Sequence, residues 1–391
     1  MTGTFTGIEA SVEALLARLV AFPTVSTASN LNLIHFVRDV LRNHGIEARL
    51  VPSADGDKAN LHAVIGPRVD GGVVLSGHTD VVPVEGQSWS SEPFTLTDRG
   101  GRLYGRGTAD MKAFAAIALA LLPEMAAADL KRPIHLALSY DEEVGCFGAP
   151  DMIADMLEAG PRPAAVIVGE PTEMKVVTAH KGTAVLRTTV TGHAVHSSHL
   201  DRGVSAVSAA ARIITWLEDR TAENRHTADP GLPFDPPFTT LHCGMIQGGT
   251  AHNIVARDCW FLTDIRNVPH ESLAEWEECY ARHLRDIVDP ALKAAHPAAG
   301  VALERLAHVP GLRPERDGSA EALARKLTGD NGRRVVAYGT EAGLFQQAGL
   351  STVVCGPGSI EQAHQPDEFI EKTQLSAGVT FLRRLISALA A

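Results

Sequence analysis

The chain has 391 residues, more than the roughly 250–300 at which a single hydrophobic core stops growing, so we expect two domains. Hydrophobic residues make up 45% of it, enough for sizeable cores. The formal net charge is −11 and no block of like charges occurs, which argues against nucleic acid or an anionic membrane as a partner.

The first helical pattern, Ile8–Phe22, is interrupted by Glu9, Glu13 and Arg18, so it predicts an amphipathic helix and not a signal peptide. The longest apolar stretch, Ala113–Leu122, is too short for a transmembrane helix, which needs about 20 residues. The five cysteines show no C-x-x-C spacing, and their number is odd. We therefore expect a cytoplasmic protein with reduced thiols and no cysteine zinc site.

Helix and strand patterns alternate along the first part of the chain. Helices are predicted at Ile8–Phe22, Leu31–His44 and Asp110–Ala127, and buried strands at Val73–Leu75, Ile134–Leu138 and Val166–Val168. This alternation predicts an α/β domain with a mostly parallel sheet. We assign residues 1–178 to its first part.

The pattern changes near His180. Strands are predicted at Thr183–Val190, Cys243–Ile246 and Cys259–Ile265, and helices at Val204–Leu217 and Glu271–Val288. This β-α-β-β-α order predicts a smaller α+β (ferredoxin-like) domain inserted at residues 179–295. Alternation resumes afterwards, with a helix at Ser319–Leu327, a strand at Thr352–Cys355 and a helix at Gln374–Leu389. Residues 296–391 would then complete the first domain.

Acidic residues and histidine follow three of the predicted strands. His78 and Asp80 follow the first, Glu142 and Glu143 the second, and Glu170 the third. Ligands of open α/β sheets bind at the carboxyl ends of strands, so these side chains could meet at one point. Their mutual repulsion would be costly without a cation, which favours a metal site.

Four motifs occur in a characteristic order. They are Gly77-His-Thr-Asp-Val-Val-Pro83, Gly105-Arg-Gly-Thr-Ala-Asp-Met-Lys112, Asp141-Glu-Glu-Val-Gly145 and Gly169-Glu-Pro-Thr172. Together they resemble the co-catalytic zinc aminoacylase/carboxypeptidase family, and the resemblance covers nearly the whole chain. It implies a metallopeptidase-like catalytic domain and an inserted lid and dimerisation domain, in a homodimeric enzyme that cleaves an amide bond in a small N-acyl amino acid.

The resemblance also implies a site with two divalent metal ions. Asp110 would bridge both ions, His78 and Glu170 would complete one, and Glu143 and His364 the other. Carboxylate and imidazole ligands without thiolate suit Zn²⁺, and also Co²⁺ or Mn²⁺. The family pattern further implies a cis peptide between Asp110 and Met111.

Other residues are assigned roles by the same resemblance. Asp80 would hold His78 in the correct tautomer, and Glu142 would be the general base and then the acid. In a dimer, His196 would reach the metal site of the partner subunit and bind the developing oxyanion there. Asn253 and Arg266 would contact the substrate, Arg266 at its carboxylate, although both could be ordinary turn and strand-edge residues.

Within the family, three stretches are most similar to the acetylornithine deacetylase branch. They are Trp89–Phe94, Tyr338–Ala342 and Gly358–Pro366. Glu341 could meet a cationic side chain such as that of ornithine, or could be a carboxylate favoured by a helix N-terminus. His252 departs from the branch, which leaves the detail near Asn253 open.

Several other functions share this ligand set. A succinyl-diaminopimelate desuccinylase, a broad aminoacylase and a dipeptidase would have the same five ligands. A metal-dependent binding protein without catalysis is an alternative of another class. The presence of Glu142 and His196 favours an enzyme, and we expect N-acetylornithine to be the substrate.

Overall fold

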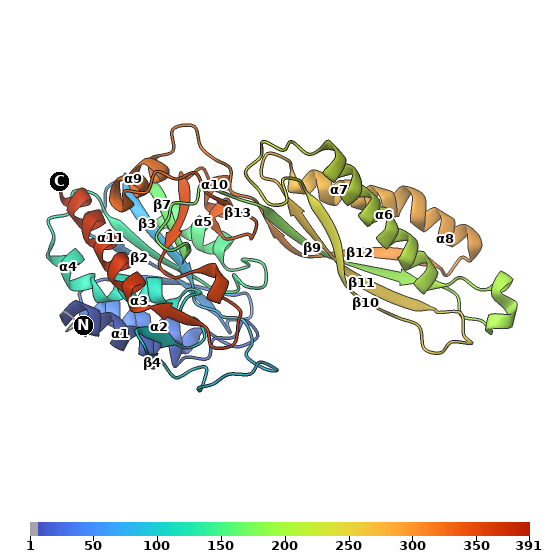
Figure 1. The fold of residues 1–391 in the computed structure, drawn as a ribbon, viewed down its shortest axis with the longest axis horizontal. Helices are drawn as coiled ribbons and strands as arrows, with labels where there is room; N and C mark the ends of the chain where they lie inside the picture. Colours follow the sequence, from blue (N-terminus) through green and yellow to red (C-terminus); the bar gives the residue numbers. More distant parts are fainter. Residues whose placement is uncertain (1–6) are drawn as a thin grey trace. The chain divides into compact units, whose positions relative to one another are not determined.

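The computed structural model describes residues 7–391, which form two compact units (Figure 1). The smaller unit comprises Ala179–Arg313 and Val335–Gly339, and the rest of the described chain forms the larger unit. We expected the chain to return to the larger unit at residue 296. The structure places the return after Arg313, because strand β12 (Gly300–Val309) pairs with β9 (Gly182–Thr191) in the smaller unit.

A six-stranded sheet in the order β1-β2-β6-β3-β7-β14 forms the centre of the larger unit. The pairs β6–β3, β3–β7 and β7–β14 are parallel, and the two pairs at the β1 edge are antiparallel. This confirms a mostly parallel α/β sheet. The strands are β1 (Ala48–Pro52), β2 (Ala59–Ile65), β3 (Gly72–His78), β6 (Ile134–Ser139), β7 (Pro163–Pro171) and β14 (Thr352–Gly356).

Helices cover both faces of this sheet (Figure 1). On one face lie α1 (Gly7–Val20), α2 (Leu31–Asn43), α3 (Lys112–Ala120), α9 (Ser319–Thr328) and α11 (Lys372–Ala390). On the other lie α5 (Ala149–Ala159) and α10 (Ala342–Gln347). A small sheet of β4 (Thr97–Arg99), β5 (Arg102–Tyr104) and β15 (Phe369–Glu371) completes the unit.

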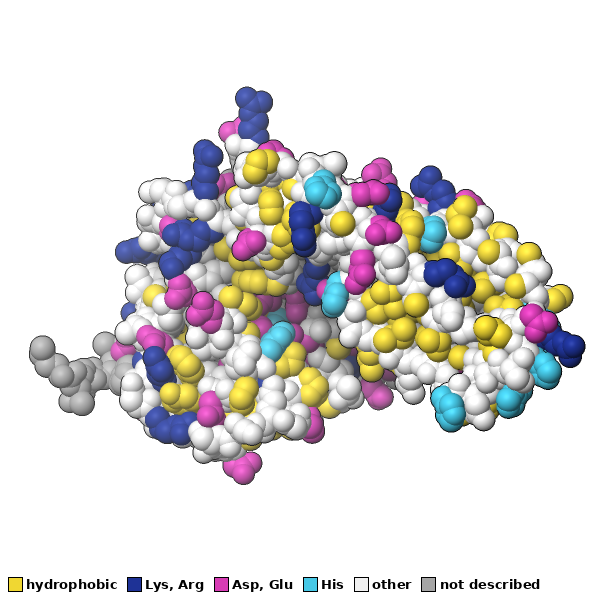
Figure 2. All heavy atoms as spheres, turned by 45° about the vertical axis from the view of Figure 1, so that its right-hand side comes forward, with side chains coloured by type: hydrophobic (Ala, Val, Ile, Leu, Met, Phe, Trp, Pro, Cys, Tyr) yellow, Lys and Arg dark blue, Asp and Glu magenta, His cyan; other side chains and the backbone are white. Residues whose placement is uncertain are grey.

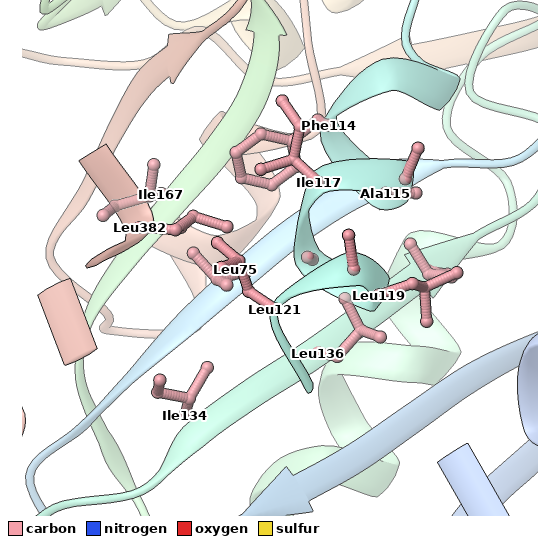
Figure 3. Close-up of a cluster of buried hydrophobic side chains, with 14 of the residues drawn as sticks. Leu75, Phe114, Ala115, Ile117, Leu119, Leu121, Ile134, Leu136, Ile167 and Leu382 are labelled. Carbon is pink, nitrogen blue, oxygen red and sulfur yellow. The ribbon is translucent and has the colours of Figure 1, made fainter. Parts of the chain in front are cut away.

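Helix α3 is the centre of the hydrophobic core, and all nine of its residues are buried. Figure 3 shows its side chains facing Leu75 of β3, Ile134 and Leu136 of β6 and Ile167 of β7. Leu382 of α11 joins the same cluster. Apart from Lys112 at its start, the helix is apolar on every side and needs such complete burial, which fixes the position of a helix that begins two residues after Asp110.

The helix predicted at Asp110–Ala127 is divided in two. Helix α3 ends at Ala120, and α4 (Leu122–Ala127) begins after Leu121, with Pro123 in its first turn. Proline has no backbone N–H to donate to the preceding turn, so it is tolerated at a helix start but interrupts a continuous helix.

The smaller unit is an antiparallel sheet in the order β10-β11-β9-β12 with helices packed on it. It contains β9, β12, β10 (Thr240–Gly248), β11 (Asp258–Asn267), α6 (Ala206–Thr227), α7 (Leu273–His283), a π-helical turn (Leu284–Val288) and α8 (Asp289–Ala295). A two-stranded parallel sheet, β8 (Ala179–His180) with β13 (Val335–Val336), also belongs to it. The resulting β-α-β-β-α-β order is ferredoxin-like, as expected.

None of the helices within residues 7–391 combines the length and the hydropathy that a membrane crossing requires.

Candidate functional site

Three neighbouring parallel strands of the larger unit end at the same edge. Strand β3 lies between β6 and β7, and its last residue, His78, pairs with Ser139 of β6. The turn after β6 carries Glu143, and Glu170 is the second-last residue of β7. The register of the sheet therefore brings these three residues to one place, where ligands of α/β sheets bind.

Asp110 lies at the centre of this place. It immediately precedes Met111, the residue before α3, and the Asp110–Met111 peptide is cis, as the resemblance implied. Its Oδ1 is 2.9 Å from His78 Nε2, and its Oδ2 is 3.3 Å from His364 Nε2. The two oxygens of one buried carboxylate thus face two different histidines.

His364 reaches the site from a distant loop, after the 3₁₀ turn η3 (Ile360–Gln362). Its φ of 62° is in the left-handed region, and its Nε2 is 2.9 Å from Glu143 Oε2. Glu143 has a 6% exposed side chain, whereas that of His364 is 52% exposed.

The five expected ligands form two groups that share one residue. His78, Asp110 and Glu170 have ligand atoms within 4.8 Å of one another, and so do Asp110, Glu143 and His364. In the first group, His78 Nε2 is 3.7 Å from Glu170 Oε1. A shared carboxylate with two separate sets of imidazole and carboxylate donors is the arrangement that holds a pair of divalent cations.

The charges at this place are unbalanced without a cation. Burial and the nearby charge of Asp110 raise the pKa of Glu143 to about 7, and burial also raises the pKa of Glu170. Hydrogen bonds to Asp110 and Glu143 raise the pKa of His364 to about 10. A set of metal ligands shows this pattern without its metal: the carboxylates resist ionisation, and the histidines stay protonated beside them.

Asp80 connects His78 with the turn after β6. His78 Nδ1 is 2.9 Å from the backbone oxygen of Asp80 and 3.5 Å from its Oδ1, which leaves Nε2 facing Asp110. The Asp80 carboxylate also accepts the backbone N–H groups of Glu142 (3.1 Å) and Glu143 (3.3 Å). One carboxylate thereby fixes both the imidazole and the turn.

Glu142 interacts electrostatically with His78 of one ligand group and with Glu143 of the other, and it has a contact that the sequence analysis did not find. The thiol of Cys146 donates to Glu142 Oε1 at 3.5 Å. Cys146 is buried, has a φ of 56°, and lies four residues after Glu142 in the same turn. The spacing could have suggested proximity, but nothing in the sequence distinguishes this cysteine from an ordinary core residue.

Glu341 lies beneath the strand ends and not on an open surface. It is 1% exposed, and its oxygens accept hydrogen bonds from Ser76 of β3 (2.6 Å) and Ser139 of β6 (2.7 Å). Both carboxylate oxygens therefore have partners within the protein. The expected contact with a substrate amine stays a prediction, and the structure adds that the side chain is tied to the two strands that end at His78 and at the Glu142 turn.

The remaining expected residues, His196, Asn253 and Arg266, lie in the smaller unit. His196 and Asn253 are exposed neighbours, since the N–H of Ser197 donates to the backbone oxygen of Asn253 at 2.9 Å. Arg266 is partly exposed, and its Nε donates to the Asp264 carboxylate at 3.0 Å. A substrate carboxylate at Arg266 would therefore have to compete with, or add to, an existing ion pair.

Proteins of known activity resemble the chain over nearly its whole length. An acetylornithine deacetylase from Proteus mirabilis is 37% identical over 367 residues, which cover 91% of each chain. Another, from Photorhabdus laumondii, is 35% identical over 380 residues and 95% of each chain.

Solved structures share the fold. An M20 family metallo-carboxypeptidase from Sulfolobus solfataricus matches with a TM-score of 0.76 and 18% identity, over 97% of this chain and 99% of that one. A tripeptidase from Staphylococcus aureus matches with a TM-score of 0.75 and 20% identity, over 98% of each chain. The sequence profile of peptidase family M20/M25/M40 matches residues 74–388. By sequence and by fold, the chain belongs to peptidase family M20/M25/M40 and is a hydrolase of amide bonds.

Proposed function

We propose that the chain is a zinc-dependent deacylase of N-acyl amino acids, and that its substrate is N-acetylornithine. The observation that carries the metal site is the position of Asp110, whose two oxygens face His78 and His364 separately. His78 and Glu170 would complete one ion's ligands, and Glu143 and His364 the other's. Imidazole and carboxylate donors without thiolate favour Zn²⁺, with Co²⁺ and Mn²⁺ as substitutes.

The donor set fits this pair of ions electrostatically. Burial, together with the charge of Asp110, raises the pKa values of Glu143 and Glu170, and His364 holds a proton between Asp110 and Glu143. Two divalent ions would replace those protons and neutralise the cluster. When bound, such ions polarise a carbonyl oxygen and lower the pKa of a coordinated water.

The chain's own residues then move the protons. Glu142 would take a proton from the attacking water as the new C–O bond forms, and give it to the leaving amine nitrogen as the C–N bond breaks. The products are a carboxylate and a free amine. Asp80 supports this step by holding the Glu142 amide and the His78 ring.

The choice of substrate is supported by the relatives, which are acetylornithine deacetylases at 35–37% identity. Desuccinylases, aminoacylases and dipeptidases would use the same ligands, so the substrate depends on other residues. We propose that Asn253 and Arg266 bind the substrate, and that Glu341 acts on the site through β3 and β6. The free state of all five cysteines agrees with a cytoplasmic enzyme.

We further propose that the enzyme is a homodimer formed by the smaller unit. Strand β10 is at an edge of its sheet, and Met245 and Ile246 on it are 54% and 51% exposed. Hydrophobic side chains gather on the face of this unit drawn in Figure 2. An exposed apolar edge strand needs a cover, and a second copy of β10 and α6 would supply one. His196 would then serve the partner's site, as a donor to the oxyanion.

A release assay tests the function. N-acetyl, N-formyl and N-succinyl forms of ornithine, methionine, glutamate and diaminopimelate are compared with the zinc-loaded enzyme, the chelated enzyme and the enzyme after zinc is restored. We expect N-acetylornithine to have the highest kcat/KM and the chelated enzyme to be inactive. A preference for a succinyl or formyl substrate would replace the proposed substrate, and full activity without metal would refute the proposed chemistry.

A further inference from the structure

A buried ion pair lies next to the ligand cluster and has no role in the proposed reaction. The side chains of Arg106 and Glu368 are each 1% exposed, and Arg106 Nη1 is 2.8 Å from Glu368 Oε2. A buried pair of this kind is weak support for stability by itself, because the cost of desolvation offsets most of the attraction. Its other hydrogen bonds point to a more specific role.

Glu368 binds the backbone of the segment that leads to Asp110. Its Oε1 accepts the N–H groups of Ala109 (2.8 Å) and Asp110 (3.1 Å), and its Oε2 accepts that of Gly107 (3.0 Å). The pairing of β5 with β15, in which Tyr104 is opposite Phe369, brings the two segments together. Charge-assisted hydrogen bonds of this type are stronger than neutral ones, so the carboxylate holds the Asp110 backbone in one position.

Arg106 extends the network to the loop that carries His364. Its Nη1 also donates to the backbone oxygen of Gln365 at 3.3 Å, and its Nη2 donates to Gln87 Oε1 at 2.6 Å. Gln87 Nε2 in turn donates to the backbone oxygen of His364 at 2.9 Å. The pair therefore joins the segment of Asp110 to the loop of His364. These two segments lie far apart in the chain, and Arg106 and Glu368 themselves are separated by 262 residues.

Only one of the two ligand groups depends on both of these segments. Asp110 and His364 belong together in the group with Glu143, whereas the other group combines Asp110 with His78 and Glu170 at strand ends. Strand β3 is paired with β6 as far as His78, and β7 is paired with β14 as far as Pro171, so the sheet itself positions His78 and Glu170. His364 has no such support and takes a left-handed backbone conformation in an exposed loop.

We propose that Arg106 and Glu368 are positioning residues that preorganise the ligand group of Asp110, Glu143 and His364 for its metal ion. The inference rests on the proposed two-metal site. Holding the bridging carboxylate and the loop histidine in place before the ion arrives removes an ordering cost from binding at this group. The ion at His78 and Glu170 depends much less on the pair. The pair itself is neutral overall, so it orders the acidic site without competing with the ions for its carboxylates.

The test is the binding of Zn²⁺ alone to the metal-free full chain, measured by titration calorimetry and by metal content after dialysis. Wild type should bind two ions tightly. In Glu368→Gln the first ion, at His78 and Glu170, should be weakened little, because the sheet still positions these two ligands. The second ion, at Glu143 and His364, should bind about 10–100-fold more weakly, the range typical of residues that support metal ligands. With Co²⁺ as the probe, the absorption spectrum of the second ion should change and that of the first should not.

Glu315→Gln is the matched control for a lost carboxylate. Glu315 also lies in the larger unit and accepts three hydrogen bonds, from Gln346 (3.0 Å), Ser351 (2.6 Å) and Thr352 (3.2 Å). None of these partners belongs to a segment that carries a proposed ligand. This variant should bind both ions as wild type does, even if its unfolding midpoint in urea falls as much as that of Glu368→Gln.

Arg106→Lys provides a second variant if Glu368→Gln does not fold. Lysine keeps the charge beside Glu368 but cannot reach Gln365 and Gln87 together, because it lacks the planar fork of arginine. It too should weaken the second ion much more than the first. A folded variant of either kind that binds two ions with wild-type affinity would overturn the inference, as would equal weakening in Glu315→Gln. A wild-type chain that does not bind two ions would instead overturn the proposed function.

Discussion

A pair of buried histidines in the central sheet should make the stability of the protein depend on pH. His62 of β2 and His135 of β6 are 2% and 0% exposed, and their rings stack at 5.5 Å. His62 Nε2 is 3.2 Å from His135 Nδ1. The outer ring nitrogens, His62 Nδ1 and His135 Nε2, have no hydrogen-bond partner among the described residues. Both rings are therefore held in the neutral form.

The sign of the effect follows from the two pKa values. Burial lowers the pKa of His62 from 6.5 to about 4, and burial together with the charge of His62 lowers that of His135 to about 3. Below pH 6.5 the unfolded chain takes up two protons that the folded chain refuses, so stability is lost as the pH falls. Each histidine costs about 1.4 kcal/mol per pH unit well below pH 6.5, and less near pH 6.5, where the unfolded ring is only partly protonated. The pair should therefore cost about 2.5 kcal/mol from about pH 7 to about pH 5.5.

The double variant His62→Leu/His135→Leu removes both titrating groups. Leucine has a similar volume, and replacing both partners of a buried hydrogen bond by apolar groups is often nearly neutral. Urea unfolding of the metal-free chain, followed by circular dichroism, gives the free energy of unfolding at each pH. Removing the metal from both proteins excludes the pH dependence of metal binding.

The expected result is a difference between the two proteins that grows as the pH falls. Wild type should lose about 2.5 kcal/mol more than the double variant between about pH 7 and about pH 5.5, and either single variant should recover about half of this. Parallel curves for wild type and the double variant would refute the reasoning, because they would mean that the rings are already accessible to protons in the folded chain.

Three further predictions concern the site. Glu142→Ala should retain both metal ions and lose at least about 10²–10⁴-fold in kcat, since it lacks the proton acceptor; near-normal turnover would make another residue the base. Asp110→Asn should weaken the binding of both ions. Zinc at a thousand times Kd should stabilise wild type by about 4 kcal/mol in thermal unfolding, and this stabilisation should be largely absent from the variant. Undiminished stabilisation would exclude a bridging role. His196→Ala should bind metal normally and be nearly inactive, and mixing it with Glu142→Ala should restore about a quarter of wild-type activity, because half the dimers carry one intact site. No recovery despite proven subunit exchange would mean that His196 does not serve the partner's site.

Local patterns in the sequence were sufficient for the main elements and for the strand-end residues. Apolar runs marked β3, β6 and β7, and the polar residues that follow them end at one edge of the sheet because parallel strands all point the same way. Strand β12 was not predicted, since Glu304 and Arg305 interrupt its alternation and its partner β9 lies more than a hundred residues earlier. A strand of this kind is defined by its pairing and not by its own composition.

The loop that carries His364 and the buried carboxylates were decided by tertiary structure. No periodicity marks His364, and its approach to Asp110 depends on the pairing of β15 with β5. Glu341 and Glu368 look like surface residues in the sequence, yet each is 1% exposed. Both are buried because hydroxyl and amide donors from distant segments surround them, Ser76 and Ser139 for Glu341 and the backbone before Asp110 for Glu368. A buried charge is tolerated only where such partners meet, and the folded chain alone determines where they meet.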